Sequence, residues 1–193
     1  MAELKDLFIS RVRVKLLQIF LSNPEEMYYV RQLVREIKEE INAVRRELGR
    51  MEERGLAKRE DRSNRAYYSF RKDYIFYPEL LALVAKTTGL GGEVIKNRNK
   101  IGKIKFAMLS GGFVKHKPQK QTEVDFLIIG EIVIPQLAVL VKNIEAKTKR
   151  EINYTAMSKE EFSFRKKRRD PFIVQILSGS RIMLIGSEEE MLA

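Results

Sequence analysis

Ile41–Arg54 constrains the fold of this chain more than any other segment, because its apolar residues recur at helical spacing. They fall on one stripe of an α-helix: Ile41, Val44, Leu48 and Met51. The opposite side is short, polar and cationic, and it carries Asn42, Ala43, Arg46 and Arg50, with Arg45 at its flank. Asn and Arg pair bidentately with base edges in the DNA major groove, so the pattern fits a helix that reads duplex DNA. It fits an ordinary amphipathic surface helix with a basic face as well.

The residues before this segment predict two further helices and a short strand. Residues 5–21 predict a helix whose apolar face holds Phe8, Ile9, Val12, Leu16, Ile19 and Phe20. Met27–Tyr29 is short and apolar and predicts a small strand, and Val30–Ile37 predicts a second helix. Only Lys38–Glu40 remains for a turn before Ile41, which is the spacing of a helix-turn-helix.

The residues after Arg54 predict a β-hairpin with a basic tip. Gly55 suits the residue that follows a helix end. Leu56–Glu60 and Ala66–Phe70 have the composition of strands, and the polar sequence DRSNR between them favours a turn.

This order of helices and hairpin resembles a known DNA-binding fold. Residues 5–72 resemble the winged-helix domains of bacterial and archaeal repressors of the ArsR and MarR type, and the run Glu53–Leu56, E-R-G-L, is part of that resemblance. The resemblance implies that Ile41–Arg54 is the recognition helix and that the wing tip holds Arg62, Asn64 and Arg65. A winged helix that serves only protein contacts is the alternative.

From this resemblance we expect double-stranded DNA as a partner. Asn42 and Arg46 are expected to read bases, and the expected backbone contacts come from Arg45, Arg50, Arg62 and Arg65. Tyr74–Thr88 is apolar and has Pro78 where a helix would begin, so we expect it to pack on the first helix or on a partner chain. Its apolar content predicts a homodimer.

The second half of the chain alternates predicted strands and helices. The predicted strands are Lys103–Ser110, Glu123–Ile129, Ile152–Met157 and Arg181–Ile185, and the predicted helices are Ile134–Lys147, Ser158 to about Arg169, and Asp170–Leu177. Gly89, Gly91 and Gly92 predict a break. We therefore divide the chain into residues 1–88, a linker or helix at 89–102, and residues 103–193. The expected fold is an α+β winged helix-turn-helix followed by a small α/β domain with a mixed sheet.

A second constellation of residues lies in this α/β half. Leu109–Phe113 contains a Gly-Gly pair after a predicted strand, and Glu123-Val124-Asp125 opens the next strand. Residues 103–157 resemble the minimal members of the nucleotidyltransferase superfamily, and the whole chain resembles winged-helix regulators with such a C-terminal domain. The resemblance implies nucleotide binding by Gly111, Gly112 and Lys115, and Mg²⁺ binding by Glu123 and Asp125 beside a nucleoside triphosphate.

The chain departs from that superfamily at three positions. Glu123 stands where Asp is usual, Gly112 stands where many active members have Ser, and Asn153 aligns with the third acid. The catalytic candidates are Glu123, Asp125 and the nearby Glu151. The same residues are also compatible with charges at a strand edge and with a tight turn. The departures favour a domain that does not transfer nucleotides efficiently.

Composition narrows the classes of function. The formal net charge is +11 and both halves are basic, which favours polyanionic partners. The absence of Cys and the single His116 exclude disulfides and thiolate chemistry, and disfavour a His-based metal site. No apolar run is long enough for a membrane span, so we expect a cytoplasmic protein. The basic run Arg165–Arg169 is compatible with phosphate binding and, more commonly, with a solvated helix face.

Three functional hypotheses remain at this point. The first is a dimeric DNA-binding transcription regulator whose degenerate nucleotidyltransferase-like domain senses a ligand or aids assembly. The second is an active, metal-dependent nucleotidyltransferase that adenylylates protein or RNA and is targeted by its winged helix. The third is an RNA-associated or antitoxin-like partner protein. The presence of a third carboxylate separates the first two.

Overall fold

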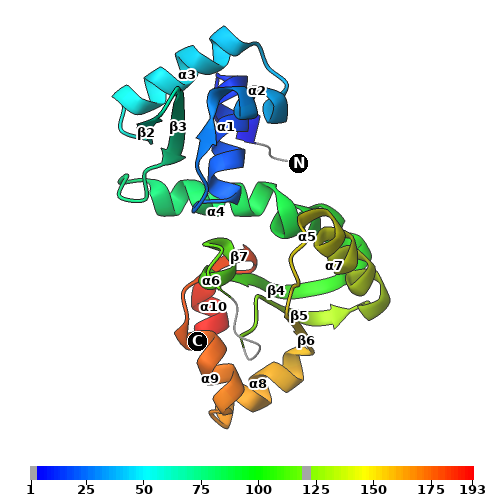
Figure 1. Ribbon diagram of the computed structural model, residues 1–193. Helices are drawn as coiled ribbons and strands as arrows, with labels where there is room; N and C mark the ends of the chain where they lie inside the picture. The colour runs from blue at the N-terminus through cyan, green and yellow to red at the C-terminus, as the bar shows by residue number, and fades with distance from the viewer. Residues whose placement is uncertain (1–3, 119–122) are drawn as a thin grey trace. The chain divides into compact units, whose positions relative to one another are not determined.

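The computed structural model describes residues 4–118 and 123–193, which form two compact units, Met1–Thr87 and Thr88–Ala193 (Figure 1). Each unit combines helices with its own β-sheet, so the fold is α+β. The elements of the first unit are the 3-10 helix η1 (Leu4–Asp6), α1 (Arg11–Ser22), β1 (Tyr28–Tyr29), α2 (Val30–Ile37), α3 (Ile41–Glu53), β2 (Ala57–Arg62), β3 (Arg65–Phe70) and α4 (Tyr77–Thr87). Those of the second unit are α5 (Gly89–Ile101), β4 (Gly102–Ser110), α6 (Gly111–Val114), β5 (Phe126–Ile132), α7 (Ile134–Thr148), β6 (Tyr154–Met157), α8 (Lys159–Lys167), α9 (Pro171–Ser178), β7 (Arg181–Ile185) and α10 (Glu188–Leu192).

The first long helix begins later than the apolar spacing predicts. The side chain of Ser10 caps α1 by accepting a hydrogen bond from the backbone N–H of Arg13, at 3.2 Å. Ile9 therefore lies outside the helix and is exposed, whereas Leu16 and Leu17 are fully buried. The predicted start near residue 5 was wrong because a local cap, not the apolar spacing, defines the helix end.

Helices α2 and α3 are joined by the short turn that the sequence predicts. Lys38 ends α2 in the left-handed backbone conformation, with φ of 54°, and its N–H donates to Val34 O at 3.0 Å. Along α3, the apolar stripe faces the core: Val44, Leu48 and Met51 are fully buried. The predicted orientation of α3 is therefore confirmed.

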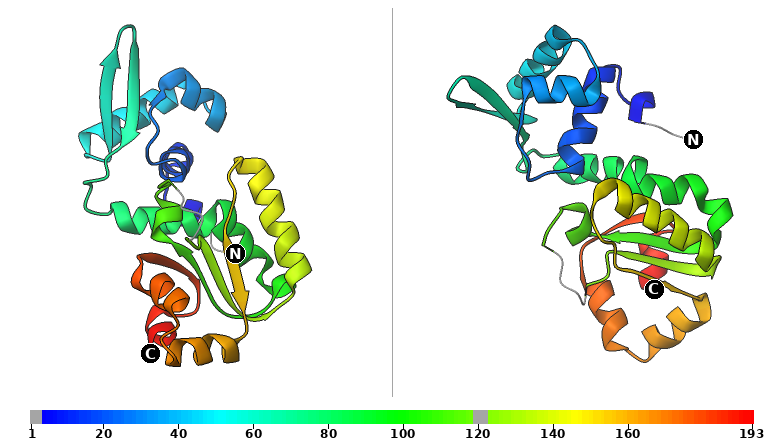
Figure 2. Two further views of the ribbon diagram at one scale, coloured as in Figure 1. Left: turned by 60° about the horizontal axis from the view of Figure 1, so that its bottom comes forward. Right: turned by 45° about the vertical axis from the view of Figure 1, so that its right-hand side comes forward.

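A three-stranded sheet, in the order β1-β3-β2, follows α3 in the first unit. Gly55, with φ of 71°, makes the sharp exit from α3. Arg62 pairs with Arg65, so the hairpin closes through the two residues Ser63 and Asn64 and its strands are longer than predicted. Figure 2 shows β2 and β3 as an arm that projects beyond the helices of this unit.

Helix α4 packs on α1 within the first unit, as one of the two predicted alternatives has it. Its buried side chains are Tyr77, Leu81 and Val84. Ile75 and Phe76, just before the helix, are exposed. The large apolar side chains of this segment are therefore buried or half-buried, except for Ile75 and Phe76, which are exposed.

The second unit is built on a mixed four-stranded sheet in the order β6-β5-β4-β7. Strand β5 pairs parallel with β6, whereas β4 pairs antiparallel with β5 and β7. Helices α5 and α7 cover one face and α8, α9 and α10 cover the other (Figures 1 and 2). The core beneath α8 to α10 consists of Phe106, Met108, Leu127, Ile129, Met157, Phe162, Ile173 and Met191. The predicted mixed sheet is confirmed.

One expectation for the second half was wrong, and one helix was not predicted. Gly91 and Gly92 do not break the chain but are buried within α5, which belongs to the second unit. Burial of Leu90 and Val94 on the same helix offsets the low helix propensity of glycine. Helix α10 was not predicted. Within the described ranges, no helix has both the length and the apolar character that crossing a membrane requires.

Candidate functional site

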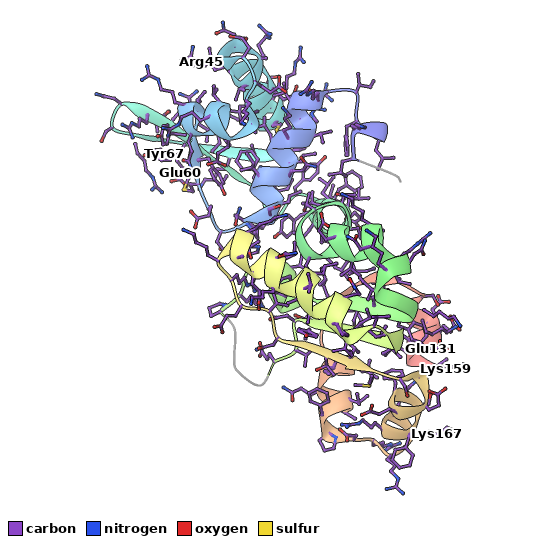
Figure 3. All side chains as sticks on the ribbon, turned by 90° about the vertical axis from the view of Figure 1, so that its right-hand side faces the viewer. Arg45, Glu60, Tyr67, Glu131, Lys159 and Lys167 are labelled. Carbon is purple, nitrogen blue, oxygen red and sulfur yellow. The ribbon has the colours of Figure 1, made fainter. Side chains whose placement is uncertain are left out.

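The exposed side of α3 gathers the residues that the sequence predicts for DNA contact. Asn42, Arg45, Arg46 and Arg50 are all exposed, and they lie opposite the buried stripe of the same helix. Figure 3 shows Arg45 on the outer side of α3. The buried stripe holds α3 against the core. One amide and three guanidinium groups on its other side therefore face solvent.

The N-terminus of α3 is occupied by an acidic cap. The Glu40 carboxylate accepts hydrogen bonds from the backbone N–H groups of Asn42 and Ala43, both at 2.8 Å. These two bonds hold the pKa of Glu40 below its ordinary value. The amides that would otherwise attract a phosphate at this helix end are therefore used, and anion binding here falls to side chains.

Arg45 and Arg46 are adjacent exposed cations of α3. Among the described residues, neither has a hydrogen-bond or ion-pair partner, although both are near enough to Glu40 to lower its carboxyl pKa further. Arg50 lies 3.8 Å from Glu47. The guanidinium donors of Arg45 and Arg46 can therefore bind an external acceptor without the loss of an internal hydrogen bond.

Glu47 supports the exposed face of α3 from behind, and it was not among the residues predicted from the sequence. It is buried, with 3% of its surface exposed, although it belongs to the basic helix α3. Its carboxylate accepts hydrogen bonds from Arg13 Nε and from Ser10 Oγ, the latter at 3.1 Å. This contact ties the middle of α3 to the first turn of α1. The signal was present, because position 47 lies three residues after Val44 and thus on the inward stripe.

The predicted wing residues lie at the end of the hairpin and are exposed. Asn64 is in the two-residue turn. Arg62 donates to Glu60 at 3.0 Å, and the Arg65 guanidinium lies 4.9 Å from the centre of the Tyr29 ring. Exposed ion pairs such as Arg62–Glu60 are weak, so a phosphate can replace the carboxylate.

The second unit contains a pocket of about 580 Å³ where the sequence predicts nucleotide chemistry. Its polar lining includes Ser110, Gly112, Lys117, Glu123 and Asp125, and the helix α9 contributes the facing wall. The two acids that the sequence singles out therefore share one cavity with the Gly-Gly turn.

The acids do not lie on the strand as predicted. Strand β5 begins at Phe126, so Glu123 and Asp125 precede it, and Glu123 is exposed while Asp125 is 3% exposed. Asp125 Oδ2 accepts the N–H of Asn153 at 2.9 Å, and Asp125 N donates to Asn153 O at 2.7 Å. The predicted strand start at Glu123 was therefore wrong, although both carboxylates line the same pocket.

The Gly-Gly turn is held by backbone contacts. Gly111 N donates to Ser180 O at 2.7 Å, and a Cβ at Gly111 would stand 2.1 Å from Ser180 Oγ. Ser110 caps α6 by accepting from Phe113 N at 3.1 Å. Of the three predicted nucleotide ligands, only Gly112 lines the pocket; Lys115 is exposed outside that lining.

The candidate third carboxylate lies elsewhere. Glu151 is exposed, precedes the start of β6 at Tyr154, and is not part of the pocket lining. The strand predicted at Ile152–Met157 begins two residues later, at Tyr154, so Glu151 lies before it. Within residues 4–118 and 123–193, no group of three His, Cys, Asp or Glu residues is placed to hold a metal ion.

Arg150 was also missed by the sequence analysis. Its Nη1 donates to Phe113 O at 2.9 Å, and its guanidinium lies 4.3 Å from the centre of the Phe113 ring. Burial lowers the pKa of Arg150, and the nearby Asp125 carboxylate partly offsets that effect. Arg150 thus joins α6, the Gly-Gly turn and the Asp125 side of the pocket.

The chain matches no protein-family model, no curated protein and no solved structure. Its functional assignment therefore rests on the geometry of these two sites.

The basic run Arg165–Arg169 at the end of α8 is largely engaged within the second unit. Arg165 pairs with Glu161 at 2.8 Å, Lys166 donates to Met191 O at 3.0 Å, and Arg168 lies over the Phe164 ring. Figure 3 labels Lys167 near the end of this helix. His116 is exposed in the turn after α6.

Proposed function

We propose that this protein is a cytoplasmic DNA-binding transcription regulator whose first unit is a winged helix-turn-helix. The observation that carries the proposal is the exposed side of α3, where Arg45 and Arg46 form no hydrogen bond or close ion pair among the described residues, while the opposite side is buried in the core. A rigid helix with available bidentate donors is what base readout in a major groove requires.

The neighbouring elements support the same interpretation. The short turn between α2 and α3 and the projecting hairpin β2–β3 occur in the order that a winged helix has. In the proposed complex, Asn42 and Arg46 read base edges. Backbone contacts come from Arg45, Arg50, Arg62, Asn64 and Arg65.

The proposed role of the second unit is to hold a nucleotide without efficient transfer. The pocket beside Gly112 and Asp125 supports nucleotide binding, because the Gly-Gly turn and Lys117 provide neutral and cationic contacts for phosphates. Two features oppose efficient transfer: Glu151 lies outside the pocket lining, and Asp125 is engaged with the Asn153 amide. Phosphoryl-type transfer depends on metal and positioning, so a reduced ligand set lowers its rate.

An active nucleotidyltransferase is the second candidate function. It is favoured by one observation, namely that Glu123 and Asp125 line the same pocket as Ser110 and Gly112, where Mg²⁺ and a nucleoside triphosphate would meet. Incubation with labelled nucleoside triphosphates, Mg²⁺ or Mn²⁺ and candidate acceptors separates the two. We expect no robust labelling; labelling that disappears in Asp125→Asn would establish the enzyme instead.

We also propose that the protein is a homodimer. The exposed apolar surface that supports a dimer is smaller than the sequence predicts. Tyr77, Leu81 and Val84 are buried inside the first unit, and Ile75 and Phe76 are exposed. Two-fold symmetry would place two recognition helices about 34 Å apart on a palindromic site. Light scattering at micromolar concentration should return twice the mass of one chain, and the single-chain mass would refute the dimer.

Selection from a pool of random duplexes tests the DNA-binding proposal. We expect salt-dependent retention of a preferred sequence, and Arg46→Ala should lower that preference by about 1–3 kcal/mol. Arg65→Ala should weaken all sequences alike and reduce the salt slope by about one unit. A protein that retains no duplex at low salt would contradict the proposal.

A further inference from the structure

The outer face of the three-stranded sheet carries a pair of tyrosines that the core does not use. Alternate residues of these strands face inward, where Tyr28, Tyr68 and Phe70 are buried. Tyr29 and Tyr67 point the other way and are only half-buried. They are cross-strand partners, because Tyr29 of β1 is opposite Tyr67 of β3.

Arginines from three elements surround these two rings. The Arg65 guanidinium lies 4.9 Å from the centre of the Tyr29 ring, and that of Arg62 lies 5.6 Å from the centre of the Tyr67 ring. Arg35 of α2 donates to the Tyr29 hydroxyl at 2.8 Å. We call these five side chains the tyrosine–arginine platform.

The platform combines aromatic surface with excess positive charge. The two ring centres are 5.9 Å apart, and the ring planes are inclined by 64°. Glu60, opposite Tyr67 on β2, is the acid of this face, and it already pairs with Lys58 and Arg62 (Figure 3). The charges of Arg35 and Arg65 are not neutralised by Glu60, so this face is complementary to a phosphate chain.

We propose that the tyrosine–arginine platform binds single-stranded nucleic acid. Unpaired bases stack on the tyrosine rings and on the planar guanidinium groups, which are themselves stacking partners for bases, while Arg35 contacts the phosphates. A duplex cannot use the rings in this way, because its bases are stacked on one another and present only their edges. The inclined rings suit a strand whose successive bases are unstacked.

This site overlaps the proposed duplex-binding surface at the wing but does not include α3. It lies on the strands β1 and β3, and its aromatic members are not among the predicted duplex contacts. Arg62 and Arg65 belong to both surfaces, so the tyrosines, not the arginines, distinguish the two modes of binding.

Fluorescence anisotropy of the full chain with labelled oligothymidylate tests the proposal. We expect Tyr67→Leu to weaken strand binding by about tenfold or more, and Tyr67→Phe, which keeps the ring, to retain it. Tyr154→Leu, at a half-buried strand position in the second unit, is the matched control and should bind as the wild type does. The protein has no tryptophan, so quenching of tyrosine emission by the strand is a second readout, and Tyr67→Leu should reduce it.

Two competitors separate stacking from charge and from duplex binding. Inorganic polyphosphate should bind the wild type and Tyr67→Leu alike, and a duplex should also bind both alike. Arg46→Ala should weaken duplex binding and leave oligothymidylate binding unchanged, so failure of the duplex proposal is visible separately. The platform proposal is overturned if the wild type does not bind the single strand, or if Tyr67→Leu binds it as tightly as Tyr67→Phe does. Equal losses for polyphosphate and oligothymidylate in Tyr67→Leu would overturn it as well.

Discussion

Glu47 in the first unit and Asp125 in the second are the two acidic side chains buried to 3% exposure in the described part of the chain. Glu47 accepts hydrogen bonds from the side chains of Arg13 and Ser10, and it is not part of the pocket lining that includes Asp125. Asp125 accepts from a backbone amide, lies near Arg150 and lines a pocket. Two carboxylates with the same exposed fraction therefore have different surroundings: Glu47 contacts side chains of another helix, and Asp125 contacts a pocket.

The difference lies in what surrounds each carboxylate. Glu47 accepts from two side chains of the α1 N-terminus, so its charge braces α3 against α1. Asp125 borders a cavity, so its charge acts both on the backbone of β6 and on whatever enters the pocket. A buried acid is thus structural or functional according to its surroundings.

The largest effect is expected at Glu47. Glu47→Ala should lower the free energy of unfolding by about 2–3 kcal/mol, because Arg13 and Ser10 lose their acceptor. The cost stays below that of a fully buried pair, since the Arg13 side chain is 33% exposed. Urea denaturation measures it, and Arg50→Ala, which removes a long and exposed contact to the same carboxylate, should cost less than about 0.5 kcal/mol. Equal losses in both variants would contradict the bracing role.

At Asp125, the shape and the charge of the side chain should have separable effects. Asp125→Ala leaves the Asn153 amide without its acceptor and should cost about 1–3 kcal/mol of unfolding free energy. Asp125→Asn retains an acceptor oxygen and should cost less than about 1 kcal/mol. Thermal or urea unfolding of the two variants makes the comparison. If Asn destabilises as much as Ala, the charge itself holds the fold and the contrast with Glu47 disappears.

Substitution of Arg150 tests whether its contacts with Phe113 hold α6 beside the pocket. Arg150→Lys keeps the charge but loses the planar contact with Phe113, and should cost about 1 kcal/mol. Hydrogen exchange should show faster opening of the α6 amides, for example Lys115 N, which bonds to Gly111 O. Unchanged exchange in α6 would mean that the Ser180 and Ser110 contacts suffice to hold the turn.

The smallest effect is expected at the exposed cap Glu40, and it depends on pH. Its folded-state pKa is depressed by the hydrogen bonds from Asn42 and Ala43, so its contribution to stability is complete above the unfolded-state value of about 4.3. It is lost as the pH falls through the lower folded-state pKa. Glu40→Gln should therefore flatten the acid limb of the stability profile and change little at neutral pH. An unchanged acid limb would show that the cap is not linked to folding.

The charge run that dominates the sequence illustrates why a pattern can mislead. Arg165–Arg169 is the densest run of cations, yet Arg165 and Lys166 bond within the second unit. Arg45 and Arg46 are a shorter run, and they lack partners among the described residues. The density of charge follows from the sequence, whereas the availability of a charge depends on the contacts it makes in the fold.

The sequence by itself determined the features that arise from neighbours along the chain. The stripe of α3, the turn at Lys38–Glu40, the caps at Ser158 and Asp170, and most strands follow from periodicity and local hydrogen bonding. These interactions span a few residues, so they can be recognised before the fold is known.

Only the tertiary structure decided which distant side chains meet. Glu47 and Arg13 are 34 residues apart, and Arg150 and Phe113 are 37 apart. Tyr29 and Tyr67 come together only because β1 pairs with β3, and Asp125 meets the Asn153 amide across 28 residues of chain. Burial and pairing of polar groups depend on the packing of whole elements, and no local pattern encodes that packing.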